Sequence, residues 1–162
     1  MPPRASLFDP LRTFKFRVRL DGKTIAGVTK VSALGRSVAS DEVKEGGDAL
    51  GPRQMPGHVT YDEVTFEQGW SGDRTLEAWA NQIAKLHADP GAAKQFKRTV
   101  FIDVFALDGN PAASAGGSAP VVSYRLDRAW VSKYVAMPEL AADGSGVGIV
   151  SVTLRHEGWE RV

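Results

Sequence analysis

An alternation of apolar and polar side chains between residues 122 and 134 constrains the fold more than any other feature of this sequence. One set of side chains in this stretch is apolar or aromatic: Val122, Tyr124, Leu126 and Trp130. The set between them is polar: Ser123, Arg125 and Asp127, with Arg128 out of phase. A period of two is typical of a β-strand with one face in a core and one in solvent. The alternation therefore predicts a sheet that covers a core.

A second alternating stretch, residues 149–157, follows a loop that contains Pro138 and three glycines. Val150, Val152 and Leu154 alternate there with polar residues, which predicts another half-buried strand. We expect the two strands to pair or to lie close in one sheet. The length of the loop between them fixes neither their register nor their adjacency.

Residues 14–20 form the first predicted strand, and the turn dipeptide Asp21–Gly22 ends it. Its two faces differ in character: Phe14, Phe16, Val18 and Leu20 on one, Lys15, Arg17 and Arg19 on the other. The basic face has two interpretations. It is a solvated strand surface, or it is a stripe that faces a polyanion or an acidic neighbouring subunit.

Three further stretches have strand character. Residues 23–34 are apolar but irregular around Gly27, which predicts a strand with a bulge or bend. Residues 59–68 change their apolar phase near Asp62, as at a bulge or where a strand passes between packing environments. Residues 99–107 are apolar on both faces apart from Asp103, which is typical of a strand covered on both sides.

Residues 46–57 contain too many glycines and prolines for regular structure, so we interpret them as a long loop between two strands. No Gly-Lys-Ser or Gly-Lys-Thr follows and no helix begins there, which argues against a phosphate-binding loop. Residues 76–86 are the only strong helical pattern. Capping oxygens at 71–73 precede it, and Asp89-Pro90-Gly91 ends it.

The composition fits a single mainly β domain, residues 11–162, behind an N-terminal arm, residues 1–10. The chain of 162 residues contains 17 glycines and 9 prolines, which indicates many turns. It contains no cysteine, so disulfides and thiolate metal sites are excluded. The net charge of +1 gives no overall attraction to nucleic acid or membranes. The N-terminus has no apolar segment of the signal-peptide kind, so we expect synthesis in the cytoplasm.

No local signature of an active site is present. His58, His87 and His156 lie far apart in the sequence, without the short spacings of a zinc site. The nucleophile elbow, the Walker A loop and the dinucleotide fingerprint are all absent. A catalytic set that assembles only in three dimensions stays open. The sequence favours a structural or binding protein over an enzyme, with no cofactor and no metal.

Five pieces of the chain, in order, resemble one known family. They are Asp9-Pro10 with Phe14-Lys15-Phe16-Arg17-Val18; Val43-Lys44-Glu45-Gly46-Gly47-Asp48 leading to Pro56-Gly57; Thr65-Phe66-Glu67-Gln68-Gly69; Ala129-Trp130-Val131-Ser132-Lys133-Tyr134; and Leu154-Arg155-His156-Glu157-Gly158. Together they resemble the tail-tube proteins of contractile phage tails and of phage-tail-like contractile injection systems. Two features depart from the family: Val131 stands where proline is usual, and the run 112–120 is long and rich in alanine.

The resemblance implies a β-sandwich or barrel-like protomer with one flanking α-helix and a long inter-strand loop. Six protomers would form a ring, and rings would stack into a rigid hollow tube that a contracting sheath drives through a target envelope. The implied partners are further copies of the chain, the sheath protein, baseplate or tube-initiator and terminator proteins, and possible cargo in the lumen. Specific nucleic-acid binding and stable membrane insertion are not expected. Assembly would take place in the bacterial cytoplasm, with release as part of the particle.

By the same resemblance, three groups of residues are candidates for assembly. Contacts between rings are expected at Gly46, Gly47, Asp48, Arg53, Met55 and Pro56. Contacts between neighbouring subunits are expected at Phe14, Phe16, Arg17, Trp130, Lys133 and Tyr134. The lumen is expected to include some of Asp41, Glu42, Lys44, Asp62, Glu63 and Glu67.

Two alternatives stay open beside a main tube subunit. A tube-initiator or baseplate-adaptor paralogue would share the fold and many of these motifs. A monomeric β-barrel that binds a small ligand or nucleic acid would use the face of Lys15, Arg17 and Arg19 as its contact surface. Self-assembly into tubes separates the first alternative from the main subunit, and salt-dependent nucleic-acid binding by a monomer would favour the second.

Overall fold

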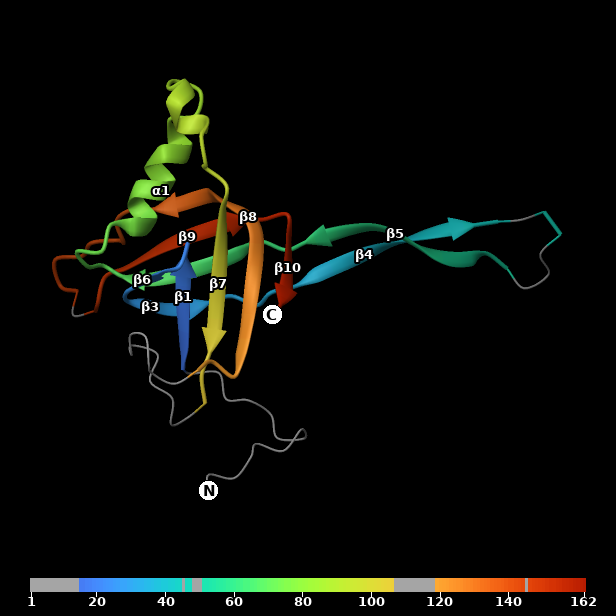
Figure 1. Cartoon of the computed structure of the whole chain (residues 1–162), viewed down its shortest axis with the longest axis horizontal. Helices are drawn as coiled ribbons and strands as arrows, with labels where there is room; N and C mark the ends of the chain where they lie inside the picture. Colours follow the sequence, from blue (N-terminus) through green and yellow to red (C-terminus); the bar gives the residue numbers. More distant parts are fainter. Residues whose placement is uncertain (1–14, 45, 48–50, 107–118, 145) are drawn as a thin grey trace.

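The structure is a computed structural model that describes residues 15–44, 46–47, 51–106, 119–144 and 146–162. Within these ranges, most strands join one bent antiparallel sheet (Figure 1), which we divide into two parts. Sheet 1 contains β1 (Phe16–Leu20), β2 (Lys23–Ile25), β7 (Arg98–Val104), the first half of β8 (Val122–Val135) and β10 (Gly158–Arg161). Sheet 2 contains β3 (Val28–Val31), β6 (Val64–Gly69), β9 (Ile149–Arg155) and the second half of β8. The mainly β fold class is confirmed.

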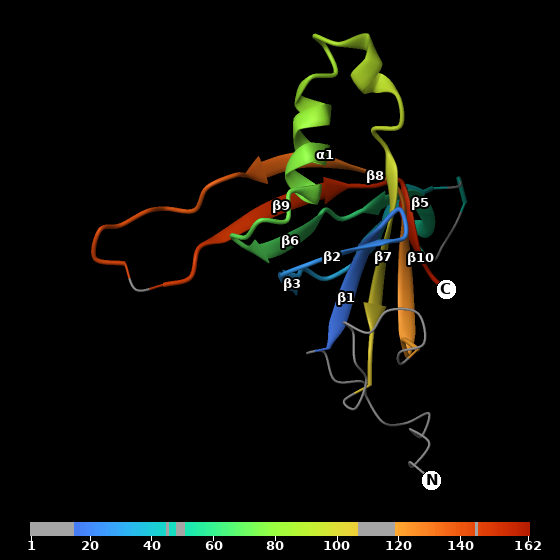
Figure 2. The ribbon, with the colours of Figure 1, turned by 60° about the vertical axis from the view of Figure 1, so that its left-hand side comes forward.

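Strand β8 is the corner that joins the two sheets. Its first half pairs with β7 and β10. Its second half pairs with β9, which confirms the predicted pairing of the stretches 122–134 and 149–157. The strands of the two sheets cross steeply (Figure 2), as in sandwiches whose corners are strands that switch sheets at a bulge. The bend lies at Arg128, whose φ of 50° is in the left-handed region.

The bend at Arg128 corrects the predicted faces of β8. Ala129 and Val131 are buried in the core, whereas Trp130 is only half-buried. A second irregularity between Val131 and Lys133 returns Tyr134 to the core side. The strand also continues to Val135, beyond the point where the alternation ends. An extra residue in a strand shifts every following side chain to the opposite face, so a simple alternation placed Trp130 wrongly.

The hydrophobic core lies between the two sheets. Its fully buried side chains come from both halves, for example Val18 of β1, Phe66 of β6 and Leu126 of β8. The predicted alternation of β9 is confirmed, since Val150, Val152 and Leu154 are all buried there.

Helix α1 (Thr75–Ala84) caps one open end of this core. The predicted helix is confirmed, although it ends before Leu86 and a short 3-10 helix, η1 (Pro90–Ala93), follows it. Trp79 is fully buried and its indole N–H donates to the carbonyl oxygen of Phe96 at 2.7 Å. The helix is therefore tied both to the core and to the segment that leads into β7.

The N-cap of α1 is Arg74, whose side chain makes no capping hydrogen bond, and Asp73, one of the predicted capping residues, lies one residue before it. Its carboxylate accepts hydrogen bonds from the backbone N–H and the hydroxyl of Thr75, and from the backbone N–H of Ala26. Burial would raise the pKa of Asp73, but these hydrogen bonds outweigh burial and lower it. Ala26 lies in the turn between β2 and β3, where Gly27 has a φ of 76°. This turn divides the predicted strand 23–34 into two short strands.

Strands β4 (Arg36–Val43) and β5 (Arg53–Tyr61) form a separate hairpin that projects from the body (Figure 1). This corrects the predicted loop 46–57, because Arg53, Met55, Pro56 and Gly57 belong to a strand. Proline and glycine are tolerated in a two-stranded hairpin, where each strand is an edge. The chain leaves the hairpin after Tyr61 and enters sheet 2 at Val64, which explains the predicted change of phase near Asp62.

Candidate assembly surfaces

The first candidate surface is the pair of free edges of sheet 2. Strand β3 pairs with β6 on one side only, and the second half of β8 pairs only with β9 among the strands that the structure describes. Beside this edge of β8 lies a hollow against α1, lined by residues that include Asn81, Ile83 and Lys133. Free strand edges offer unpaired backbone donors and acceptors to another chain.

The second candidate surface is the outer face of sheet 2, which is polar. At its centre the hydroxyls of Thr65 and Thr153 lie 3.2 Å apart, and the hydroxyl of Ser132 donates to the backbone carbonyl of Thr153. Lys30 and Glu67 approach within 4.0 Å on the same face. This is a polar surface of small hydroxyl side chains with a few charges, unlike the core face.

The third candidate surface is the β4–β5 hairpin. Every residue of β4 is exposed, and β5 is exposed apart from two half-buried positions. Several of its exposed side chains are apolar: Val38, Val43, Met55 and Val59. The hairpin therefore presents hydrophobic surface to solvent on an element that contributes nothing to the core.

The predicted ring-to-ring contacts fall on this hairpin, in a form that the sequence did not predict. Gly46 and Gly47 lie in its turn, whereas Arg53, Met55 and Pro56 lie on β5. Asp48 lies outside the described residues. Three of the residues predicted to make these contacts in a long loop therefore lie on a paired strand with a defined register.

The predicted lumen residues lie in three separate places. Asp41, Glu42 and Lys44 are on or beside β4, and the carboxylate of Asp41 lies against Gly57, where an added Cβ would meet it at 2.5 Å. Asp62 and Glu63 lie near the base of the hairpin, where Asp62 packs against Gly35 and Glu63 forms an ion pair with Arg155. Glu67 projects from the outer face of sheet 2. The structure does not bring all six together.

The predicted subunit-contact residues are also dispersed. Phe16 borders a groove, and Trp130 and Lys133 lie on β8 near its free edge. Tyr134 packs against the core beside α1. Phe14 and the arm 1–10 lie outside the described residues, as does most of the run 112–120.

Arg17 belongs to a buried charge cluster that sequence reasoning missed. The carboxylate of Asp103 is fully buried and accepts hydrogen bonds from Arg17 at 3.0 Å and from Arg19 at 2.7 and 3.1 Å. The hydroxyl of Ser123 donates to it at 2.7 Å. Burial would raise the pKa of Asp103, but these hydrogen bonds outweigh it and lower the pKa below its usual value.

The two guanidinium groups of this cluster also cover aromatic rings. Arg17 lies over Phe105 and Arg19 over Phe101, at 5.0 and 4.6 Å from the ring centroids. Strand 99–107 was predicted to be covered on both faces. The side chains of Arg17 and Arg19 provide the cover on its outer face. Part of the predicted basic stripe is neutralised within the protomer. The only sequence signal for this was the lone Asp103 in an apolar strand.

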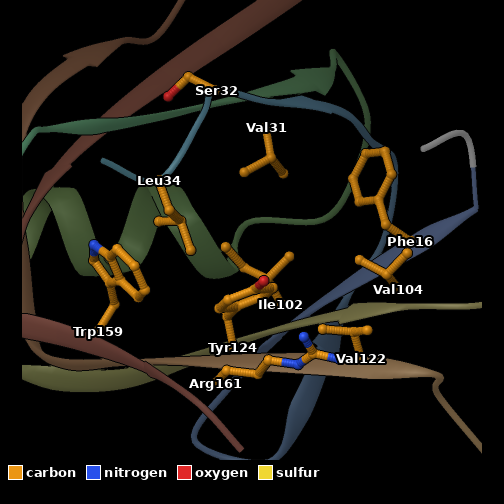
Figure 3. A pocket seen from close by; sticks show the side chains of 10 residues that line it. All are labelled: Phe16, Val31, Ser32, Leu34, Ile102, Val104, Val122, Tyr124, Trp159 and Arg161. Carbon is orange, nitrogen blue, oxygen red and sulfur yellow. The ribbon is translucent and has the colours of Figure 1, made fainter. Parts of the chain in front are cut away.

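A groove opens between sheet 1 and the segment after β3 (Figure 3). Its volume is about 440 Å³, and its walls are mostly apolar, with Phe16, Leu34, Ile102 and Trp159 among them. Ser32, the Tyr124 hydroxyl and Arg161 supply its few polar groups. It offers apolar contact area and no pair of acid and base groups.

The described ranges hold no group of three or more His, Asp or Glu side chains placed to bind a metal ion. No helix within them has the length and apolar character to cross a membrane.

Chains in three solved structures share this fold. The sheath–tube complex of an extracellular contractile injection system, PVC, in the extended state has a TM-score of 0.73 at 18% identity, covering 96% of this chain and 93% of that chain. The PVC sheath/tube terminator in the extended state has a TM-score of 0.73 at 18% identity, with 97% and 99% covered. Hcp1 from Flavobacterium johnsoniae has a TM-score of 0.52 at 13% identity, with 90% and 93% covered.

The sequence comparison is more specific than the shared fold. A search of curated protein sequences found no match. The sequence profile of the T4-like virus tail tube protein gp19 matches residues 12–160, which is nearly the whole chain. The resemblance read from the five sequence pieces is thereby confirmed, and the chain belongs to the T4-like virus tail tube protein gp19 family.

Proposed function

We propose that this protein is the main inner-tube subunit of a contractile injection system or phage tail. Protomers form hexameric rings, and the rings stack into a hollow tube that sheath contraction drives through a target envelope. The role is structural and not enzymatic. The family membership supports the tube, and the structure of the PVC sheath–tube complex is a relative of the same fold.

The observation that carries this proposal is the projecting β4–β5 hairpin. Its β4 strand buries no side chain, and an isolated two-stranded hairpin is at best marginally stable in water. A stable hairpin of this length needs a surface to pack on, and beyond its base, where Arg36 lies over Trp159 and Tyr61 lies beside His156, it projects away from the described part of the body. Contact with an adjacent ring would supply that surface.

Ring closure would use the free edges of sheet 2. The edge of β3 in one protomer can pair with the edge formed by Trp130–Val135 of β8 in the next, so each copy uses two different edges. Such a head-to-tail contact closes into a ring and removes every exposed strand edge of that sheet. The position of Trp130 and Lys133 on this edge supports their assignment as subunit contacts.

In such a ring the polar outer face of sheet 2 would line the lumen. The small hydroxyl side chains of Thr65, Ser132 and Thr153, with Glu67, suit a water-filled channel through which cargo passes. Asp41, Glu42 and Lys44 would reach toward the neighbouring ring instead. The tube would assemble in the bacterial cytoplasm with sheath, baseplate and terminator proteins, and leave with the particle.

Electron microscopy of the purified protein, with its size-exclusion profile, tests this function directly. A main tube subunit gives rings and hollow tubes of uniform width without a template. A tube-initiator or baseplate-adaptor paralogue gives rings that stack only on an added partner. A clean monomer at high concentration contradicts both and favours a ligand-binding barrel that uses the groove beside Trp159.

A shortened hairpin tests the stacking role. Val38 and Val59 are paired in register, so a two-residue Asn-Gly turn can replace residues 39–58 without disturbing β6. Deleting only 46–57 would cut into β5. The shortened protein is expected to fold and form rings, because the removed residues contribute no core side chain, but it forms no tubes. Tubes of normal width and length from this variant would refute the role of the hairpin.

A further inference from the structure

The groove of Figure 3 opens onto the hydrophobic core. Its lining residues come from strands and their connections and include none from α1. Four large side chains line it and pack against the core while staying half-buried: Phe16, Val31, Leu34 and Trp159. Its volume of about 440 Å³ is within the range of ligand sites, roughly 300–1,000 Å³. Walls of this kind favour an apolar occupant.

Arg161 is the charged group of this groove. It lies on β10 opposite Tyr124 of β8, and both residues line the groove. The side chain of Arg161 is exposed and forms no ion pair or hydrogen bond with any residue that the structure describes. An occupant that combines apolar side chains with one carboxylate would complement both the walls and this guanidinium group.

Residues 1–14 lie outside the described residues, and their composition matches the groove. Beyond Met1, their large apolar side chains are Leu7, Phe8, Leu11 and Phe14. Asp9 is their only acidic residue. Residues 107–118, the other long stretch outside the described ranges, contain a single large apolar side chain, Leu107. Of the two stretches, only residues 1–14 carry enough apolar side chains to fill the groove.

The N-terminal segment is also long enough to cross the groove. It joins β1 at Phe16, which pairs with Val104 of β7 and forms one wall. Arg161 on β10 is three strand spacings away in the order β1, β7, β8 and β10, which is about 14 Å at roughly 4.8 Å per spacing. The seven residue steps from Asp9 to Phe16 span up to about 23 Å when extended. Asp9 can therefore reach Arg161 while the residues after it cross the apolar walls.

We propose that residues 7–14 bind in the groove of their own chain, with Leu7, Phe8 and Leu11 against its apolar walls and Asp9 paired with Arg161. A segment tethered beside its site has an effective concentration of about millimolar, which favours it over a second copy of the chain. The inference concerns a single protomer and does not depend on the tube function. It gives the groove a resident occupant, so a small ligand binds there only by displacing the segment.

A single thiol in the groove of the full-length protein tests the inference, because the chain contains no cysteine of its own. Val31→Cys supplies the thiol, and its rate of alkylation by N-ethylmaleimide reports access to the groove. Adding Leu7→Ser with Phe8→Ser is expected to raise this rate about tenfold or more, because the serines remove much of the apolar contact that holds the segment. Ala5→Ser with Thr13→Ser is the matched control and is expected to leave the rate unchanged.

A double-mutant cycle in the same Val31→Cys background tests the ion pair. Asp9→Asn and Arg161→Gln should each raise the alkylation rate about two- to fourfold, the size expected of an exposed ion pair. The double variant should raise the rate no further than either single variant, because both remove the same contact. Effects that multiply instead would overturn the pairing of Asp9 with Arg161.

Val152→Cys distinguishes an opened groove from an unfolded protein, since the side chain of Val152 lies in the core and is 1% exposed. Its thiol should stay unreactive when Leu7 and Phe8 are replaced by serine. If it becomes reactive, Phe8→Ser alone repeats the measurement.

Two outcomes overturn the inference and leave the tube function intact. One is an alkylation rate of the Val31→Cys thiol that does not change when Leu7 and Phe8 are replaced. The other is a rate that rises when the full-length protein is diluted, since the protection then comes from another copy of the chain. The tube function is tested separately, by the presence of rings and tubes in electron micrographs.

Discussion

Replacement of Asp103 by asparagine is the sharpest test of how sheet 1 is held together. The substitution keeps the size of the side chain and removes its charge. Four hydrogen bonds reach the carboxylate, from Arg17, twice from Arg19, and from Ser123. These bonds tie together β1, β7 and β8, which are far apart in the sequence. Asp103→Asn leaves two guanidinium groups facing a neutral amide.

The expected loss is about 2–3 kcal/mol of unfolding free energy. Hydrogen bonds to charged groups each contribute roughly 1.5–3 kcal/mol, but their contributions do not add. Breaking a fully buried ion pair costs about 3–5 kcal/mol. Here the side chains of Arg17 and Arg19 are 18% and 28% exposed, so water solvates the stranded charges in part and lowers that cost.

Urea unfolding at pH 7, with equal protomer concentrations because association stabilises the folded state, measures this loss. With a denaturant slope of about 2 kcal/mol/M, the midpoint should fall by roughly 1–1.5 M. Glu160→Gln is the control, since it removes a carboxylate that pairs with Arg125 on the exposed surface of the same sheet, and it should cost less than about 1 kcal/mol.

The pH dependence provides a second readout of the same interaction. The folded-state pKa of Asp103 is lowered from its ordinary 3.8, so its stabilisation is complete above that value and is lost as pH falls through the folded pKa. The difference between wild type and Asp103→Asn should therefore shrink below about pH 4. Two results would refute the reasoning. One is a loss of unfolding free energy below about 0.5 kcal/mol at pH 7, which is the size expected of an ordinary surface substitution. The other is a loss that stays constant down to pH 3.

Four further substitutions, two at Arg128 and two at Trp79, test the corner and the helix by urea unfolding. Arg128→Val should lower the free energy of unfolding by about 1–2 kcal/mol, because a β-branched residue resists a φ of 50°. Arg128→Gly should keep a free energy of unfolding near that of wild type. Equal losses from the two variants would show that the bend does not need this conformation. Trp79→Ala should cost about 3–5 kcal/mol through the cavity it leaves. Trp79→Phe should lower the free energy of unfolding by about 1–2 kcal/mol, since the Phe96 carbonyl loses its hydrogen-bond donor. An unchanged free energy of unfolding would exclude that hydrogen bond as a stabilising contact.

The positions of most strands and of the helix could be predicted from the spacing of apolar residues in the sequence. Each wrong prediction has an identifiable physical cause. β9 and α1 have regular backbones, so Val152 and Trp79 occupy the core as their spacing predicts. Trp130 was misplaced because a backbone bend at Arg128 leaves no mark in the pattern of apolar residues. The hairpin was mistaken for a loop because Pro56 and Gly57 are penalised in most strands but not in a freely projecting pair.

The candidate surfaces depended on information that local sequence does not contain. Asp103 and Arg17 are 86 residues apart, so only the pairing of β1 with β7 shows that the basic face is neutralised in part. The free edges of β3 and β8 depend on which strands pair, which the long loops left undetermined. Membership of the tail-tube family came from five dispersed pieces, each too short to specify a surface by itself.

The topology also sets an order for biosynthesis. The hairpin, residues 36–61, pairs only with itself and emerges from the ribosome long before the strands that complete the body. β1 can pair with β7, and β6 with β9, only after the later strand has been synthesised. Arg17 of β1 and Asp103 of β7 are 86 residues apart, and Thr65 of β6 and Thr153 of β9 are 88 residues apart. Such distant pairings form slowly. Sheet 2 is complete only after β9 has joined β6 to β8. In the proposed tube we therefore expect only finished, released protomers to enter a ring.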